Sequence, residues 1–341
     1  MKKQKLAIIG ASYLQMPLVL KAKELGIETH CFAWEEGAVC KPFVDVFYPI
    51  STIDKQKILE ICEQVQIDGI TSIASDVAVP TINFIAHNLG LIGNQPADTL
   101  ACTNKFLMRE RFKHQDVSSP MFCKIGKADA FSFIESFKFP LIAKPVDRSG
   151  SRGVEKVNSR NELKKAIKRA QKESFANECI VEEYIDGVEV SVESISWEGI
   201  HYVLAITDKE TTGAPYFVEL AHHQPSLLDG NIQNKIILET KKALDALNIK
   251  FGASHSEFKI TNDGEVYVIE IGARMGGDFI GSDLVYLSTG YDFLKGVIEI
   301  ALGNFITPIL NQKKYSGVYF LSKERENLKT FIENKSEYYI K

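Results

Sequence analysis

Several features that would indicate common protein classes are scarce in this sequence of 341 residues. No apolar run approaches the roughly 18–20 residues that cross a bilayer, so no membrane-spanning helix is predicted. The formal net charge of −4 gives no electrostatic argument for binding nucleic acid or a membrane surface. The six cysteines form no C-x-x-C pair, which argues against a zinc site and for a reducing, cytoplasmic compartment. They are Cys31, Cys40, Cys62, Cys102, Cys123 and Cys179.

Two familiar nucleotide-binding motifs are missing as well. The residues that follow the first predicted strand, from Gly10 to Gln15, lack the G-x-G-x-x-G spacing of a dinucleotide site. The phosphate loop G-x-x-x-x-G-K-[ST] does not occur, so the chain is not a P-loop ATPase. If the protein binds a nucleotide, it must do so with other residues.

The composition that is present is typical of a soluble globular protein of two or three domains. Apolar residues make up 45% of the chain and charged residues 25%. In the first part of the chain, predicted strands alternate with predicted helices, which indicates an open α/β domain with a parallel sheet over residues 1–97. The strands are predicted at 6–10, 28–33 and 69–74, and the helices at 16–25, 54–66 and 81–89.

This first domain is predicted to shape a substrate cleft, and a cofactor domain is the alternative. Ligands in open parallel sheets bind beyond the carboxyl ends of the strands. Gly10, Ser12 and Asp76 lie at or just after the ends of predicted strands and are therefore candidate contacts.

The most informative stretch, residues 255–274, is predicted to form a β-hairpin. Asp263-Gly264 indicates a two-residue turn, because both residues tolerate the positive φ that such a turn needs. With that turn, Glu257 lies directly opposite Glu270, and His255 lies opposite Gly272. Opposed carboxylates repel each other unless a cation lies between them, and oxygen ligands suit Mg²⁺.

Two alternatives to this magnesium site remain. A three-residue loop with a bulge would break the register, and the acidic face could be merely solvated. Side chains alternate along a strand, so the same face carries further charged groups. The residues predicted on it are His255, Glu257, Lys259, Glu270 and Arg274.

A second candidate site is a glycine–serine loop beside a lysine. A strand predicted at 139–145 leads to Lys144, and the loop 149–153 follows. Backbone N–H groups of such a loop can bind an anion, and the lysine can hold a polyphosphate; an ordinary turn is the alternative. Lys105, in a helix predicted over 98–113, is by itself more typical of a solvated charge.

Two further strands are predicted at 180–185 and 188–193, and the second places Glu189, Ser191 and Glu193 on one face. In chain order, these features resemble the ATP-grasp superfamily. The resemblance is greatest to its ATP-dependent carboxylate–amine ligases, which are related to carbamoyl-phosphate synthase, D-alanine–D-alanine ligases and L-amino-acid ligases. It covers about residues 1–330. The residues that carry it are Lys105, Ala143-Lys144-Pro145, 149–153, 182–189, Glu257 and 270–277.

The resemblance implies a mixed fold of α/β and α+β parts. An N-terminal open parallel α/β (pre-ATP-grasp) domain over 1–97 would precede an ATP-grasp domain over 98–310. The latter would contain a small lid subdomain with the glycine loop, at about 115–185, and a C-terminal antiparallel-sheet subdomain. A strand and a helix would follow in 311–341; since relatives usually continue further, the chain is expected to be a short natural form or truncated.

The resemblance also implies roles for individual residues in binding ATP. Two lysines would contact the phosphates, the glycine loop would close over them, one strand end would bind the adenine, and a glutamate would bind the ribose. In that order, these are Lys105 and Lys144; Ser149, Gly150, Ser151 and Gly153; Glu182, Glu183, Tyr184 and Ile185; and Glu189.

For the metal and the reaction, the resemblance implies that Glu257 and Glu270 hold one or two Mg²⁺ ions, with Mn²⁺ as a substitute. Arg274 would balance charge on the transferred phosphoryl group. Many relatives have Asn where this chain has Gly272, so a water would replace that ligand or a second ion would be held more weakly.

The stretch 207–225 is rich in hydroxyl residues, Gly and Pro and is predicted to be a long loop. Its likeness to the substrate-side loop of the ligases implies that Lys209, Glu219 and His222 face the acceptor or the phosphate. Packing of the two histidines at a strand end is the alternative.

The implied function is an ADP-forming ligase for a small carboxylate, amino acids included, and an amine. The carboxylate would attack the γ-phosphate, and the amine would then expel phosphate from the acyl phosphate, without a protein nucleophile. Alternatives are carboxylation or phosphorylation of a small metabolite, and nucleotide binding without turnover. The expected partners are the two small-molecule substrates, with no nucleic acid or membrane, and a homodimer is left open.

Overall fold

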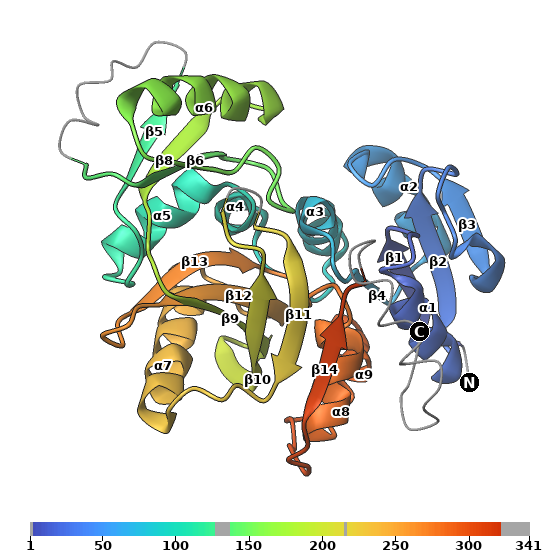
Figure 1. Cartoon of the computed structure of the whole chain (residues 1–341). Helices are drawn as coiled ribbons and strands as arrows, with labels where there is room; N and C mark the ends of the chain where they lie inside the picture. Colours follow the sequence, from blue (N-terminus) through green and yellow to red (C-terminus); the bar gives the residue numbers. More distant parts are fainter. Residues whose placement is uncertain (1–2, 127–136, 215–216, 322–341) are drawn as a thin grey trace.

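The structure, a computed structural model, describes residues 3–126, 137–214 and 217–321, and these residues form three β-sheets with helices packed around them (Figure 1). The predicted mixture of α/β and α+β parts is confirmed. Within the described residues, every helix is too short or too polar to span a bilayer.

The first sheet is parallel, as the alternation of strands and helices predicts. Parallel strands are joined by crossovers. Buried apolar side chains of two crossover helices, and of a third helix that follows the last strand, pack with the sheet in its core. The strand order is β3 (Val46–Pro49), β2 (Glu28–Ala33), β1 (Lys5–Ile9) and β4 (Gly69–Thr71), and the helices are α1 (Met16–Glu24), α2 (Lys55–Val65) and α3 (Val79–Leu89).

The single helix predicted over 98–113 is wrong, because the chain breaks just before Lys105. A short helix α4 (Pro96–Thr99) and a 3₁₀ turn come first, and α5 (Lys105–His114) then begins. The Asn104 side chain accepts hydrogen bonds from two backbone N–H groups of α5, at 3.0 and 3.1 Å, and so caps the new helix. Lys105 therefore stands at the first position of α5.

The second sheet is antiparallel and carries the glycine loop. Helix α6 (Arg160–Glu173) begins at the predicted cap Ser159 and packs its apolar side, which includes Leu163 and Ile167, on this sheet. The strand order is β5 (Phe122–Ile125), β8 (Cys179–Glu183), β6 (Leu141–Pro145) and β7 (Glu155–Val157).

The third sheet is antiparallel and has six strands. Helix α7 (Gly230–Ala246) packs on one face with apolar residues of α5, and the other face carries the charged side chains described below. Strand β13 (Val266–Gly272) is followed in sequence by the π-helix η5 (Ile280–Leu284), α8 (Val285–Thr289) and α9 (Phe293–Ala301). The strand order is β13 (Val266–Gly272), β12 (Gly252–Ile260), β9 (Val188–Trp197), β10 (Ile200–Thr211), β11 (Glu219–Gln224) and β14 (Ser316–Tyr319).

The prediction of a long loop over 207–225 is wrong. Strands β10 and β11 run antiparallel through most of it, with Lys209 opposite His222. Pairing on both edges of β10 outweighs the weak strand propensity of its polar residues. The strand predicted near the end of the chain is β14, and the helix predicted after it lies outside the described residues.

The 255–274 hairpin is confirmed, with the predicted register at its acidic end, but the predicted pairing beside the turn and the predicted two-residue turn are wrong. Glu257 lies opposite Glu270 and His255 opposite Gly272. The loop has three residues, 262–264, closed by a hydrogen bond from Gly264 N to Thr261 O of 2.9 Å. A bulge next to Glu257 shifts the pairing by one residue and restores the predicted register at the acidic end.

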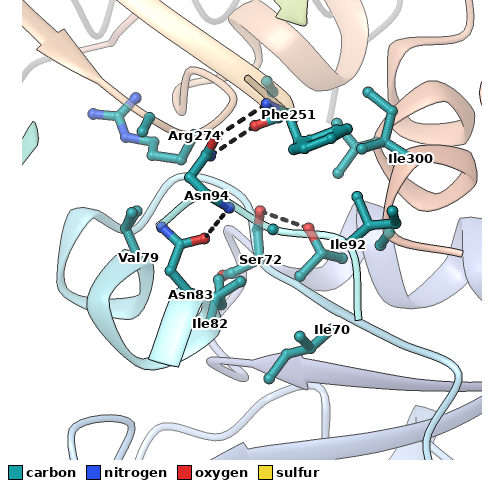
Figure 2. Close-up of a pocket in the computed structure, with 17 residues that line it drawn as sticks. Ile70, Ser72, Val79, Ile82, Asn83, Ile92, Asn94, Phe251, Arg274 and Ile300 are labelled. Atoms are coloured by element: carbon teal, nitrogen blue, oxygen red, sulfur yellow. Dashed lines mark hydrogen bonds between the residues drawn. The ribbon is translucent and has the colours of Figure 1, made fainter. Parts of the chain in front are cut away.

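The first and third sheets share a core. Buried residues of β1, β2 and α1 join residues of β9, β12 and α9 in one apolar cluster. At its edge, Asn94 accepts hydrogen bonds from the backbone N–H groups of Lys250 and Phe251 and donates one to Phe251 O. Figure 2 shows the two hydrogen bonds between Asn94 and Phe251. The segment after α3 is thereby fixed to the start of β12.

Candidate active site

One cleft brings together side chains from all three regions of the fold. Its walls are formed by β6, β8 and the glycine loop on one side and by β9, β10, β12 and β13 on the other. Most of the predicted site residues line it. They are Lys105, Lys144, Ser149, Gly150, Ser151, Glu182, Glu183, Tyr184, Ile185, Glu189, Lys209, Glu257, Glu270 and Arg274.

Lys144 is held by a buried ion-pair network. Its Nζ lies 2.7 Å from Glu182 Oε2, and Arg109 Nε lies 2.9 Å from Glu182 Oε1. Burial lowers the pKa of Lys144 against the opposing effect of Glu182. Burial alone would raise the pKa of Glu182, but Arg109 and Lys144 hold it below its ordinary value. Contact between this carboxylate and an adenine would require these ion pairs to open. No sequence pattern indicated Arg109.

Lys105 joins the hairpin to the start of the glycine loop. Its Nζ lies 2.6 Å from Glu270 Oε1 and donates to Arg148 O at 2.7 Å. In the loop itself, Gly150 and Ser151 have φ values of 66° and 53°. Such left-handed residues turn neighbouring N–H groups toward one side, as in an anion-binding nest. Gly153 lies at the base of the loop against Pro145 and does not line the cleft.

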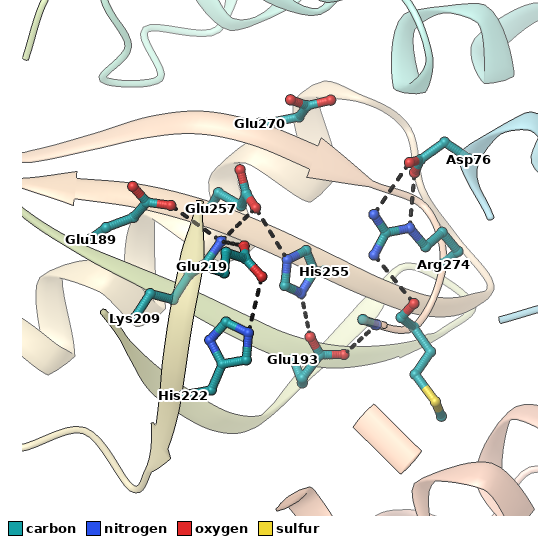
Figure 3. Close-up of polar contacts among 12 residues, drawn as sticks. Asp76, Glu189, Glu193, Lys209, Glu219, His222, His255, Glu257, Glu270 and Arg274 are labelled. Atoms are coloured by element: carbon teal, nitrogen blue, oxygen red, sulfur yellow. Dashed lines mark hydrogen bonds and ion pairs between the residues drawn. The ribbon is translucent and has the colours of Figure 1, made fainter. Parts of the chain in front are cut away.

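Lys209 lies on the floor of the cleft among three carboxylates (Figure 3). Its Nζ is 2.6 Å from Glu219, 2.9 Å from Glu257 and 3.2 Å from Glu189. Burial alone would lower the pKa of Lys209, but Glu257, Glu189 and Glu219 raise it well above its ordinary value. The ammonium group therefore stays charged. Glu189 also contacts Lys259 Nζ, at 3.2 Å, and Glu257 also contacts His255.

Glu257 and Glu270 are the candidate metal ligands. They are opposed in register and line the same cleft as Lys144. Over the described part of the chain, no group of three or more His, Cys, Asp or Glu side chains converges to hold a metal ion. Mg²⁺ typically takes one or two carboxylates and completes its shell with water and substrate phosphates. This pair of oxygen donors fits such an ion when phosphates are present, and Gly272 adds no ligand.

Glu257 contacts a buried pair, His255 and Glu193, which sequence reasoning did not bring together. His255 Nδ1 lies 2.5 Å from Glu193 Oε1, and Glu193 Oε2 accepts a hydrogen bond of 2.9 Å from Gly276 N. His255 Nε2 lies 3.5 Å from Glu257 Oε1. Burial alone would lower the pKa of His255, but Glu193 and Glu257 raise it to about 9. Strand alternation predicted the face of each residue, but not their contact across β9 and β12.

His222 contacts Glu219 and does not line the cleft. The side chain is fully buried, and its Nε2 lies 3.0 Å from Glu219 Oε2. Burial alone would raise the pKa of Glu219, but His222 and Lys209 lower it to about 2. The structure thus places His222 behind the carboxylate that contacts Lys209.

Arg274 reaches the cleft from the residues after β13 and forms an ion pair with Asp76. Its Nε lies 2.9 Å from Asp76 Oδ1. Burial alone would raise the pKa of Asp76, but Arg274 lowers it. Of the three candidate contacts in the first 97 residues, Asp76 lines the cleft, whereas Gly10 and Ser12 do not. Ser12 instead donates a hydrogen bond to the Gln15 side chain, which covers the end of β1.

Comparison with known proteins identifies the domain that carries most of these residues. Residues 137–283 match the family model described as an ATP-grasp domain. Among solved structures, an L-amino acid ligase from Bacillus licheniformis superposes with a TM-score of 0.79 and 27% sequence identity, over 94% of this chain and 80% of that one. The match includes the first sheet as well as the two antiparallel sheets, since it extends over almost the whole chain.

Two curated relatives are similar in sequence over shorter ranges. The alanine–anticapsin ligase of Bacillus subtilis (strain 168) is 28% identical over 247 residues, which are 65% of this chain and 51% of that protein. A D-alanine–D-alanine ligase of Flavobacterium johnsoniae is 34% identical over 161 residues, which are 45% of this chain and 49% of that protein. The chain thus spans about half the length of these relatives.

Proposed function

Because the chain carries an ATP-grasp domain, we propose that it is an ADP-forming ligase that joins a small carboxylate to an amine through an acyl phosphate. One observation carries the proposal: two buried lysines, an opposed pair of glutamates and an arginine line a single cleft. These residues are Lys105, Lys144, Glu257, Glu270 and Arg274.

The proposed nucleotide site lies between the glycine loop and β13. Lys105 and Lys144 contact the phosphates, and the loop with Ser149, Gly150, Ser151 and Gly153 closes over them. The backbone of Glu183, Tyr184 and Ile185 binds the adenine, and Glu189 binds the ribose. For Glu182, the buried ion pairs favour a role in holding Lys144 in place; direct contact with the adenine is the alternative.

The proposed metal ligands are Glu257 and Glu270, with nucleotide phosphates and water completing the shell of one or two Mg²⁺ ions. Mn²⁺ is expected to substitute. A bound Mg²⁺ would withdraw charge from the phosphate oxygens. Lys209 and His255 contact Glu257 and hold its carboxylate in a fixed position beside the phosphates.

In the reaction, a substrate carboxylate oxygen attacks the γ-phosphorus, the bond to the β,γ-bridging oxygen breaks, and ADP leaves. The amine nitrogen then attacks the acyl carbon, loses a proton, and inorganic phosphate leaves. Lys144 and Arg274 stabilise negative charge in these steps, and no protein nucleophile is needed. Closure of the glycine loop excludes water, which would otherwise hydrolyse the acyl phosphate.

The substrate class is proposed from the relatives' names. The alanine–anticapsin ligase, the D-alanine–D-alanine ligase and the L-amino acid ligase are all named for amino acids. An amino acid is therefore the first substrate to test here, as the acid, the amine or both.

A matrix of amino acids and small acids, each incubated with MgATP, tests the proposal through ADP release and mass spectrometry of the product. We expect ADP release that requires both an acid and an amine, and a product heavier than the acid by the amine less water. ADP release that requires bicarbonate would indicate a carboxylase, release without any amine would indicate a kinase-like enzyme, and nucleotide binding without release would refute turnover.

Three further proposals concern the organisation of the protein. We propose domain boundaries near residues 97 and 310, a cytoplasmic location and a homodimer. Limited proteolysis would test the boundaries, and light scattering on the purified chain would test the dimer. A monomer at micromolar concentration would refute the last proposal.

A further inference from the structure

Gly272, at the end of β13, makes room for an ion pair. Its φ lies outside the left-handed region, so the backbone conformation does not require glycine. A Cβ at this position would lie only 2.8 Å from Asp76 Oδ1 and 3.1 Å from Arg274 Nε. A larger residue here would therefore push the two charged groups apart.

The ion pair fixes the guanidinium of Arg274 on two sides. Nε and Nη2 donate to the two oxygens of Asp76 at 2.9 and 3.2 Å, and Nη1 donates to Met275 O at 3.3 Å. A guanidinium has five N–H groups, so two remain, one on each terminal nitrogen. Figure 3 shows this end of the group turned away from Asp76, toward the side of the cleft where His255 and Glu257 lie.

The backbone next to Asp76 is hydrogen-bonded to the residues that follow β13. Ala74, two residues earlier, donates a backbone hydrogen bond of 3.1 Å to Met275 O. Ala74 has a φ of 55°, a strained value for a residue with a side chain. The segment after β4 is thus held against the end of β13, which limits the directions in which Asp76 can present its carboxylate.

We propose that Asp76 is a positioning residue that directs the free end of the Arg274 guanidinium toward the phosphoryl group in the cleft, and that Gly272 is needed to admit it. The inference rests on the proposed function, since that function supplies the phosphoryl group. It makes the first, parallel-sheet region a part of the active site, although that region lies outside the matched domain.

Calorimetric titration with MgADP, alone and with aluminium fluoride as a phosphoryl mimic, tests this role without knowledge of the substrates. In Asp76→Asn, the amide group faces Nη2 and repels it. We expect the affinity for MgADP alone to stay within about twofold. The increase in MgADP affinity that aluminium fluoride causes, called the gain below, should fall at least about tenfold, because a small misplacement of a positioning group is costly. Gly272→Ala is expected to lose the gain similarly, and Arg274→Lys serves as the reference.

Two matched variants control for general effects. Asp45→Asn removes an ion pair from the same region, and Gly230→Ala adds a Cβ where nothing lies within 4 Å. Both should keep the full gain. The inference is overturned if Asp76→Asn keeps the gain that Arg274→Lys loses, if Asp45→Asn loses it equally, or if the unmodified protein binds MgADP but shows no gain. A failure to bind MgADP at all would instead refute the proposed function, and the inference with it.

Discussion

The two walls of the cleft carry opposite excesses of charge. On the wall formed by β6, β8 and α5, Lys144 and Arg109 share the single carboxylate of Glu182. The floor, formed by β9, β10, β11, β12 and β13, has more carboxylates than cations: Glu189, Glu193, Glu219, Glu257 and Glu270 against Lys209, Lys259 and His255. The first wall is therefore complementary to phosphate, and the floor is complementary to a cation.

This difference provides the charges with which the proposed site would bind a metal–nucleotide complex without a P-loop. A polyphosphate and a divalent ion placed between the walls would each face the charge that it lacks. Like charges that lie close together on each wall repel each other. The buried ion pairs of Glu182 with Lys144 and of Glu193 with His255 offset part of this repulsion. The comparison predicts that changes on the two walls have different consequences.

The largest effect is expected on the floor. Glu270→Gln removes one of two opposed carboxylates, and we expect turnover to fall at least about 10²-fold, the usual cost of losing a preorganised charge contact. Activity should also require more Mg²⁺. Steady-state kinetics over a range of Mg²⁺ concentrations would measure both effects.

Glu265→Gln is the control for this change, because Glu265 lies in the same hairpin but is exposed beside the turn. Its kinetics and Mg²⁺ requirement should match those of the unmodified protein. Near-normal turnover in Glu270→Gln would refute the metal assignment and remove the contrast between the two walls.

On the opposite wall, Lys144→Met should weaken nucleotide binding by about tenfold or more and also destabilise the fold. The change leaves Glu182 buried with Arg109 as its remaining partner, which we expect to cost about 3 kcal/mol of unfolding free energy. Denaturant titration and nucleotide titration would separate the two effects. In Lys144→Met with Glu182→Gln, part of the stability should return while nucleotide binding stays weak; recovery of binding would show that Lys144 is only structural.

Lowering the pH should reduce the unfolding free energy through protonation of Glu219. The pKa of this carboxyl is about 2 in the folded protein against an ordinary value of 4.5. A lowered pKa stabilises the fold above pH 4.5, and the contribution is lost as the pH falls from 4.5 to about 2. Glu219→Gln should therefore show a shallower fall of unfolding free energy across this interval. Equal slopes in both proteins would contradict the ion pairs of Glu219 with Lys209 and His222.

How much of this site could be predicted from the sequence depended on whether the contacts were local. Strand alternation within one hairpin predicted that Glu257 would face Glu270. The two-residue turn assumed for that register is absent, and a bulge restores the pairing. The lysine beside a glycine loop was likewise found from adjacent residues. The parallel first sheet followed from the alternation of strands and helices, although the short strand β3 carried no clear pattern.

The contacts that complete the site join residues far apart in the chain, and periodicity contains no information about them. Asp76 and Arg274 are 198 residues apart, and Glu193 and His255 are 62 apart. The stretch 207–225 was predicted wrongly for a related reason, since its polar residues form strands through pairing with β9 and β14. The length of the hairpin turn was also predicted wrongly, because Asp-Gly also suits a three-residue loop with a left-handed glycine.

The smallest effect is expected from a change in the hairpin turn, which should alter the stability of the fold but not the dependence on Mg²⁺. Gly264 has a φ of 81°, so Gly264→Ala should cost about 1–2 kcal/mol of unfolding free energy, because a side chain disfavours that conformation. Gly264→Asn should cost less, since Asn tolerates the left-handed region. Denaturant titration would measure both costs, and Mg²⁺ dependence should stay unchanged because the bulge fixes Glu257 and Glu270 independently of the turn. An alanine variant as stable as the unmodified protein would contradict the left-handed conformation of Gly264.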